Sequence, residues 1–233
     1  MLTSDNRKLP YLTRLLALPV LAAAITAFTV RTGTGINTGL PLDRIYTVVI
    51  DAGHGLVNNA HTGAHAGEVY EDDIVLALAR KVQTLNTDRR LRIILTRPDA
   101  RGVDLKKRVE IAAQNKADYF ISLHVNMTEA RSEGRSSGME IFVAKDSSAL
   151  DAGSRLIASA VREEVGSIYK THPGLLRPAQ HVWVLDHNVC PSTLIECGYI
   201  NDAADRSFIT SEEGQELLAQ KILSAISHAA SAK

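Results

Sequence analysis

The sequence contains little of several residue types that mark particular classes of protein. Aromatic residues make up 5% of its 233 residues, and 26 basic residues are balanced by 26 acidic ones. A protein that binds nucleic acid usually presents a basic field or a set of aromatic side chains on which bases stack. Because the composition favours neither, we expect no nucleic acid among the partners of this chain.

Cysteine is also scarce, and only Cys190 and Cys197 are present. An exported chain can join two cysteines in a disulfide. However, Pro191 and an expected strand separate these two residues, and an extended strand holds its ends too far apart for the bond. We therefore expect two unbonded core residues.

The first 31 residues differ from the rest of the chain. Three basic residues precede an uncharged run at positions 15–30, and Arg31 follows it. A basic start, a short apolar run and small residues for cleavage are typical of a secretory signal. Since about 20 apolar residues span a bilayer comfortably, we favour a cleaved signal peptide over a signal anchor that attaches the chain to a membrane through residues 15–30.

Residues 32–44 are rich in Gly and Thr and predict a linker, so the expected domain covers residues 45–230. With 45% hydrophobic residues, a chain of this length supports one domain with a substantial core. We expect a monomer that is exported to the periplasm or the cell envelope.

Apolar and amphipathic runs alternate within the expected domain. The apolar runs predict strands at residues 46–50, 92–96, 119–123, 139–143, 181–185 and 193–196. The amphipathic runs predict helices at residues 72–86, 104–116, 148–165 and 212–229. This order indicates an α/β fold whose sheet is covered on both faces, with functional residues at strand ends.

Four residues with suitable chemistry lie at the ends of such runs: His54, Glu71, His124 and Glu196. Two histidines and one carboxylate can hold a tetrahedral zinc ion and leave one position for water. A further carboxylate nearby can take and return protons. Together these residue types indicate a metal-assisted hydrolase.

The histidines also have structural interpretations. His54 follows a strand between two glycines and could be a solvated loop residue, and His124 could be hydrogen-bonded within the fold. His61 and His65 have the spacing of two ligands on a helix, but they lie among glycines. We expect a loop there and discount both as ligands.

The carboxylates leave a similar choice. Glu71 and the two aspartates that follow it all stabilise the start of a helix through its dipole, and spacing does not choose among them. Glu196 ends an apolar strand, where an unpaired carboxylate is unfavourable. Its partner could be a metal-bound water or an arginine, Arg108 or Arg177.

Six segments, in this order, resemble those of the zinc-dependent N-acetylmuramoyl-L-alanine amidases of the Amidase_3 type. They are VIDAGHG at 49–55, EDDIVLA at 71–77, LTRPD at 95–99 with Leu105 and Arg108, ISLHVN at 121–126, GMEIF at 138–142 and LIECGYIN at 194–201. The corresponding family patterns include D-P-G-H-G, E-K-D, S-[IL]-H-A-N and L-x-E-x-G-F-x-x-N. The departures are modest, and two of them, Leu56 and Val125, add bulk near the expected site.

The resemblance implies a single domain with a mixed, mostly parallel sheet flanked by helices on both faces. It also implies zinc ligands at His54, Glu71 and His124, with Glu196 as the general base. The expected reaction is hydrolysis of the amide between N-acetylmuramic acid and the L-alanine of the stem peptide in peptidoglycan. Two alternatives are a zinc hydrolase of another exported peptide amide and a non-catalytic wall-binding module, although a binding module has no need of all four residues.

Some relatives carry an inhibitory helical insertion before the strand expected at 139–143. Here only the short polar segment 127–137 occupies that place. We therefore expect no inhibitory helix and an open zinc cleft.

Overall fold

The structure is a computed structural model that describes residues 44–128, 136–144 and 149–232. The expected signal at residues 1–31 and all of the expected linker except its last residue lie outside this part of the chain. Most of the segment expected to lack an inhibitory helix also lies outside it. Among the helices of the described residues, none is both long enough and apolar enough to cross a membrane.

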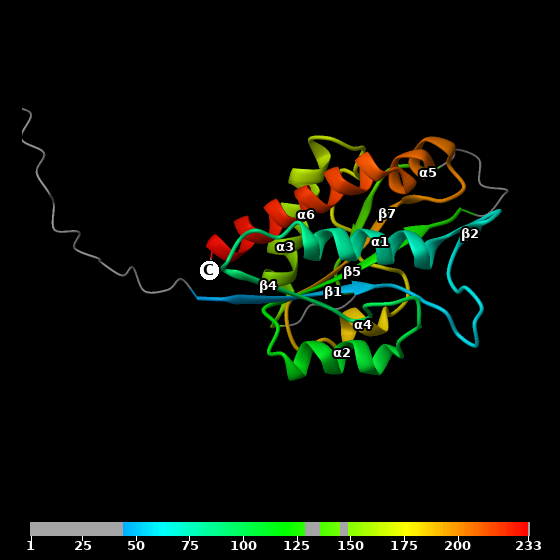
Figure 1. Ribbon diagram of the computed structural model, residues 1–233. Coiled ribbons are helices and arrows are strands. Elements are labelled where there is room, and N and C mark those ends of the chain that lie inside the picture. Colours follow the sequence, from blue (N-terminus) through cyan, green and yellow to red (C-terminus); the bar gives the residue numbers. More distant parts are fainter. Residues whose placement is uncertain (1–43, 129–135, 145–148, 233) are drawn as a thin grey trace, which may run out of the picture. The chain divides into compact units, whose positions relative to one another are not determined.

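Five strands form one sheet in the order β4-β1-β5-β7-β6 (Figure 1). They are β1 (Tyr46–Ala52), β4 (Leu91–Leu95), β5 (Tyr119–Asn126), β6 (Glu140–Phe142) and β7 (Ser192–Tyr199). β6 pairs antiparallel with β7, and the other neighbours pair in parallel. The sheet is therefore mixed and mostly parallel, as predicted. Two short strands, β2 (His65–Ala66) and β3 (Val69–Tyr70), form a separate antiparallel pair.

Helices cover both faces of this sheet (Figure 1). One face carries α1 (Glu71–Thr84), α3 (Asp151–Gly166) and α6 (Glu212–Ser231), and the other carries α2 (Leu105–Gln114) and α4 (Trp183–Asp186). The remaining helix, α5 (Ala203–Thr210), packs against α6 and β7. The α/β fold with helices on both faces is confirmed.

The alternation of side chains along the central strands divides the core between the two faces. In β1, Val48 and Ile50 belong to the larger cluster beneath α1, α3 and α6. Val49, between them, packs in a smaller cluster with Val109 of α2 and Val184 of α4. Because both faces of the sheet are covered, the strand is apolar throughout rather than alternating.

The four predicted helices and five of the six predicted strands are present, with ends that differ by a few residues. The strand predicted at residues 181–185 is wrong, because the chain there forms the helical turn α4. A run of five residues is too short to show a period of two or 3.6, so its apolar character fits either structure. The structure also adds α5, whose N-cap Asp202 accepts hydrogen bonds from the backbone N–H groups of Ala204 and Asp205.

A buried carboxylate joins the ends of the central strands. Asp51 of β1 is 1% exposed, and its Oδ1 accepts hydrogen bonds from Thr96 Oγ1 at 2.6 Å and Arg108 Nη1 at 2.7 Å. Its Oδ2 accepts from Ser122 Oγ of β5 at 2.7 Å. A buried charge is tolerated when it is paired and hydrogen-bonded, and these contacts meet both conditions.

We expect Asp51→Ala to lower the free energy of unfolding by about 3–5 kcal/mol, because it leaves the buried guanidinium of Arg108 without its carboxylate. Urea denaturation followed by circular dichroism measures the change. Asp99→Ala is the matched control, since the pair of Asp99 with Arg101 is exposed and should contribute little to the free energy of unfolding. Equal effects of the two substitutions would contradict the role assigned to Asp51.

Candidate metal centre

The carboxyl ends of the parallel strands meet at one edge of the sheet, and the four candidate residues lie there. His54 follows the end of β1, His124 lies near the end of β5, and Glu196 lies opposite His124 in β7. Glu71 is the first residue of α1, the helix that packs against β1 and β5. The structure thus brings together residues that are far apart in the sequence, as functional sites at strand ends require.

Three of these side chains form a compact group. Glu71 Oε1 lies 3.3 Å from His54 Nε2 and 3.0 Å from His124 Nδ1. The two imidazole rings meet edge to face, with their centroids 4.9 Å apart. The ligand-type atoms of all three residues lie within 4.8 Å of one another, which is a geometry that can hold a metal ion.

The backbone fixes the carboxylate of this group. Glu71 is 3% exposed, its Oε1 accepts a hydrogen bond from Val125 N at 2.9 Å, and its Oε2 accepts one from Ala64 N at 2.7 Å. Burial raises the pKa of the Glu71 carboxyl, but its hydrogen bonds with His124 and His54 outweigh burial and leave the pKa well below its usual range. The carboxylate is therefore ionised and held in one orientation.

Two glycines allow side chains of this group to approach the backbone closely. A Cβ atom added at Gly53 would lie 2.5 Å from both Cε1 and Nε2 of His124. At Gly63, where φ is +91°, an added Cβ would lie 2.5 Å from Glu71 Oε2. The imidazole and the carboxylate thus occupy space that only glycine leaves free.

Glu196 lies beside the group without joining it. Its Oε2 is buried and has no hydrogen-bond partner among the described residues. Burial raises the pKa of Glu196 to about 7; the charge of His124 opposes this shift, while Glu71 and Glu140 add to it. A carboxyl group with this pKa can both accept and release a proton near neutral pH.

The two arginines considered as partners of Glu196 have other partners. Arg108 pairs with Asp51, and Arg177 Nη2 lies 2.7 Å from Asp151 Oδ1. The salt-bridge interpretation of Glu196 is therefore wrong for both arginines.

The first turn of α1 resolves the choice that spacing had left open. Glu71 faces the two histidines, whereas Asp72 accepts a hydrogen bond from His61 Nδ1 with both of its carboxylate oxygens, at 2.9 and 3.1 Å. His61, Asp72 and Asp73 form a second group of ligand-type atoms within 4.8 Å of one another. The glycines around His61 led us to discount it as a ligand, and nothing in the sequence indicated its hydrogen bonds with Asp72. Cys190 and Cys197 are buried and are not joined by a disulfide, as expected.

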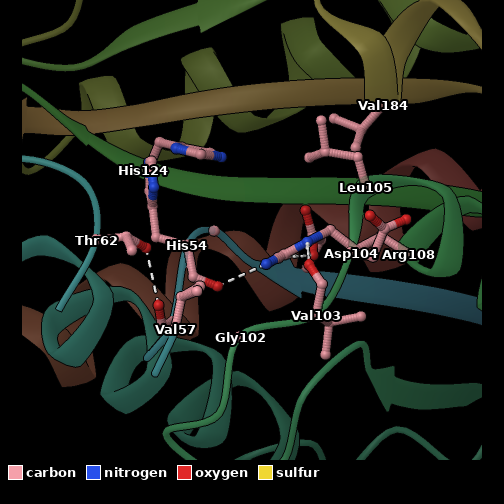
Figure 2. Close-up of a pocket in the computed structure, with 13 residues that line it drawn as sticks. His54, Val57, Thr62, Gly102, Val103, Asp104, Leu105, Arg108, His124 and Val184 are labelled. Carbon is pink, nitrogen blue, oxygen red and sulfur yellow. Dashed lines mark hydrogen bonds and ion pairs between the residues drawn. The ribbon is translucent and has the colours of Figure 1, made fainter. Parts of the chain in front are cut away.

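A cleft of about 400 Å³ extends from the group (Figure 2). His54 and His124 lie at one end, and the far end is lined by Val103, Leu105 and Val184. Figure 2 also shows Arg108 reaching the carbonyl oxygen of His54, at 2.6 Å. A polar group that opens into a cleft of this size is typical of a small-molecule or substrate site.

Comparison with known proteins identifies related sequences. Residues 48–228 match the family model Amidase_3, described as N-acetylmuramoyl-L-alanine amidase. The uncharacterized protein YqiI of Bacillus subtilis is 31% identical over 180 residues, which are 77% of this chain and 82% of YqiI. The N-acetylmuramoyl-L-alanine amidase LytC of the same organism is 28% identical over 177 residues, which are 76% of this chain but only 34% of LytC.

Solved structures show the same fold. The catalytic domain of CwlV, an N-acetylmuramoyl-L-alanine amidase from Bacillus (Paenibacillus) polymyxa var. colistinus, is 30% identical, with a TM-score of 0.69 over 81% of this chain and 100% of that domain. The CwlD amidase from Clostridioides difficile, solved in complex with the GerS lipoprotein, is 28% identical, with a TM-score of 0.70 and the same coverage. With a family model that matches most of its length, the chain belongs to the Amidase_3 family of N-acetylmuramoyl-L-alanine amidases.

Proposed function

We propose that the chain hydrolyses the amide between N-acetylmuramic acid and the L-alanine of the stem peptide, with a zinc ion bound by His54, Glu71 and His124. Membership of an amidase family supports the reaction. One observation supports the roles given to these residues. The three ligand-type side chains lie together beside the buried Oε2 of Glu196, which has no hydrogen-bond partner among the described residues.

The residues present fit zinc. Two imidazoles and one carboxylate are the ligand set of catalytic zinc sites that keep one open position. The ionised Glu71 contributes a negative charge that a cation would balance. The buried Oε2 of Glu196 has no partner within the part of the chain that the structure describes, and a water molecule in the site would supply one. Mn²⁺ or Co²⁺ could replace zinc in vitro, because the same ligand types bind them.

Bound zinc would polarise the amide carbonyl and lower the pKa of a water molecule bound to it toward about 7, far below that of bulk water. Glu196 accepts a proton from the attacking water as the new C–O bond forms. When the C–N bond breaks, Glu196 returns that proton to the nitrogen of the departing L-alanine. The products are the carboxylic acid of the lactyl group and a stem peptide with a free amine, and the acid gives up its remaining proton to the medium or to the amine.

Peptidoglycan lies outside the cytoplasm, so a chain that hydrolyses it acts there, as the family of cell-wall amidases implies. We propose that residues 1–31 direct this export. The mass of the mature protein would show whether the signal is removed.

Incubation of the full chain with purified peptidoglycan should release intact stem peptides with a free L-alanine amine. A chelator should stop the release and added zinc should restore it, because the ligands hold the metal that activates the water. Mass spectrometry of the soluble products measures both effects. Cleavage of small peptides but not of peptidoglycan would instead indicate a hydrolase of another exported amide.

Glu196→Gln should lower turnover at least about 100-fold, because glutamine cannot take the proton of the attacking water. Zinc content measured by atomic absorption should not change, since Glu196 lies outside the ligand group. A variant that retains near-normal turnover would show that Glu196 is not the proton-transfer residue.

The same substitution should stabilise the metal-free protein at high pH. The pKa of Glu196 is about 7 in the folded state and 4.5 ordinarily, so ionisation of this carboxyl group penalises folding by about 3 kcal/mol above pH 7. The penalty disappears as the pH falls toward 4.5. The stabilisation by Glu196→Gln in urea denaturation should therefore be largest near pH 8 and small at pH 5. A difference between the two proteins that does not depend on pH would contradict the raised pKa.

Gly53→Ala should weaken zinc binding about 10-fold or more, because the added methyl group displaces the His124 ring. Competition with a chelating dye measures the affinity. Gly174→Ala is the matched control, since nothing lies within 4 Å of a Cβ atom at that position. Equal zinc affinities for the two folded variants would show that the His124 ring has room to move.

A further inference from the structure

The buried guanidinium of Arg97 contacts four backbone carbonyls near the metal centre. Arg97 follows β4 and is 1% exposed. Its Nε donates to Ala52 O at 2.9 Å and its Nη1 to Asp99 O at 3.0 Å. Its Nη2 donates to both Gly53 O at 2.9 Å and Asp72 O at 2.7 Å. No carboxylate oxygen of the described residues forms a hydrogen bond or ion pair with it.

Two of these carbonyls adjoin residues of the ligand group. Gly53 precedes His54 and Asp72 follows Glu71, so one nitrogen atom bridges the loop that carries the first histidine and the helical turn that carries the carboxylate. Hydrogen bonds to a single donor fix how far apart the two segments lie.

The loop that Arg97 contacts has a strained backbone. His54 has φ of +57°, in the left-handed region that residues other than glycine rarely adopt. Such a conformation persists only where the surroundings determine it. Arg108 donates to the carbonyl oxygens of His54 and Ala52 at 2.6 Å, so all three carbonyls from Ala52 to His54 are bound by one or both arginines.

The burial of Arg97 is unfavourable when considered by itself. Burial and the nearby charge of Arg108 lower the pKa of the Arg97 guanidinium more than the charges of Asp72, Asp51 and Asp73 raise it, and its hydrogen bonds go to carbonyl groups. Its positive charge would also repel a metal ion at the adjacent site. Net electrostatic attraction therefore does not explain why an arginine is buried here. Its planar set of donors, in contrast, matches the positions of the four carbonyls.

We propose that Arg97 is a positioning residue that sets the separation of the His54 and Glu71 segments and so prepares the site for zinc; this rests on the proposed metal centre. Its contribution is geometric. Removal of its donors lets the two segments move apart, even though it also removes a repulsive charge.

The test compares Arg97→Met, which removes the charge and the donors, with Arg97→Lys, which keeps the charge and loses the planar set of donors. Arg206→Met is the matched control, because Arg206 Nη1 also donates to a backbone carbonyl, Ile200 O at 2.7 Å, but on α5. Competition with a chelating dye gives the zinc dissociation constant of each full-length protein, corrected for the folded fraction found by urea denaturation. The visible spectrum of the cobalt-loaded protein reports the geometry of the ligands.

Both Arg97 variants should bind zinc about 10–100-fold more weakly than the wild type and show an altered cobalt spectrum. The control should bind within twofold of the wild type. Unchanged or tighter zinc binding by folded Arg97→Met, with an unchanged spectrum, would overturn the proposal. A wild-type chain that binds no zinc would instead refute the metal centre itself, and this inference with it.

A second measurement needs no variant and decides the matter if the substitutions prevent folding. The amides of Gly53 and Glu71 donate to Leu123 O at 3.0 Å and Ala64 O at 2.9 Å. If Arg97 prepares the site, both amides resist hydrogen exchange in the metal-free wild type, and zinc adds little. Protection that appears only after zinc is added would overturn the proposal, because the metal would then order the segments.

Discussion

The buried carboxylate of Asp51 is the contact on which the arrangement of the site depends. Through Thr96, Arg108 and Ser122 it connects the central strand β1 with the residue after β4, the helix α2 and the neighbouring strand β5. These contacts lie where the strands end, immediately before the loop that carries His54. The same guanidinium that neutralises Asp51 also binds the carbonyl of His54. A single ion pair therefore both stabilises the sheet and holds the loop of one candidate metal ligand, His54.

The site combines groups that a stable fold would otherwise avoid. Glu196 is half-buried, and its buried Oε2 has no hydrogen-bond partner among the described residues. His54 has a left-handed backbone, and Arg97 is buried with no hydrogen bond to a carboxylate of the described residues. Each of these features is unfavourable for the metal-free protein, and all three lie at the same edge of the sheet. Local conflicts of this kind are expected where a protein has a function, because the surrounding fold stabilises what the site by itself could not. A bound cation and a water molecule would relieve the first of them directly.

The cleft has apolar walls beside its polar end. Val57 and Leu105 are more than half exposed and line the cleft together with the buried Val184. Apolar side chains around a small number of polar groups are typical of a substrate site. Glu71 and its neighbour Asp72 meanwhile serve different histidines, since successive residues of a helix point in directions about 100° apart.

Much of the fold and of the candidate site could be predicted from the sequence, because hydrophobic periodicity and residue type are local properties. They indicated the helices, the central strands and the four residues at strand ends, and the resemblance to a family selected Glu71. The short run at 181–185 carried too few residues to show a period, and only packing against α2 and β7 made it helical. Tertiary structure likewise decided the partner of Arg108. Its partner Asp51 lies 57 positions away in the chain. Whether Arg108 reaches Asp51 or Glu196 depends on which strand lies next to α2. The bridge from Arg97 to two backbone carbonyls had no signal in the sequence, because the backbone is the same at every residue and only the fold determines which carbonyls a side chain can reach.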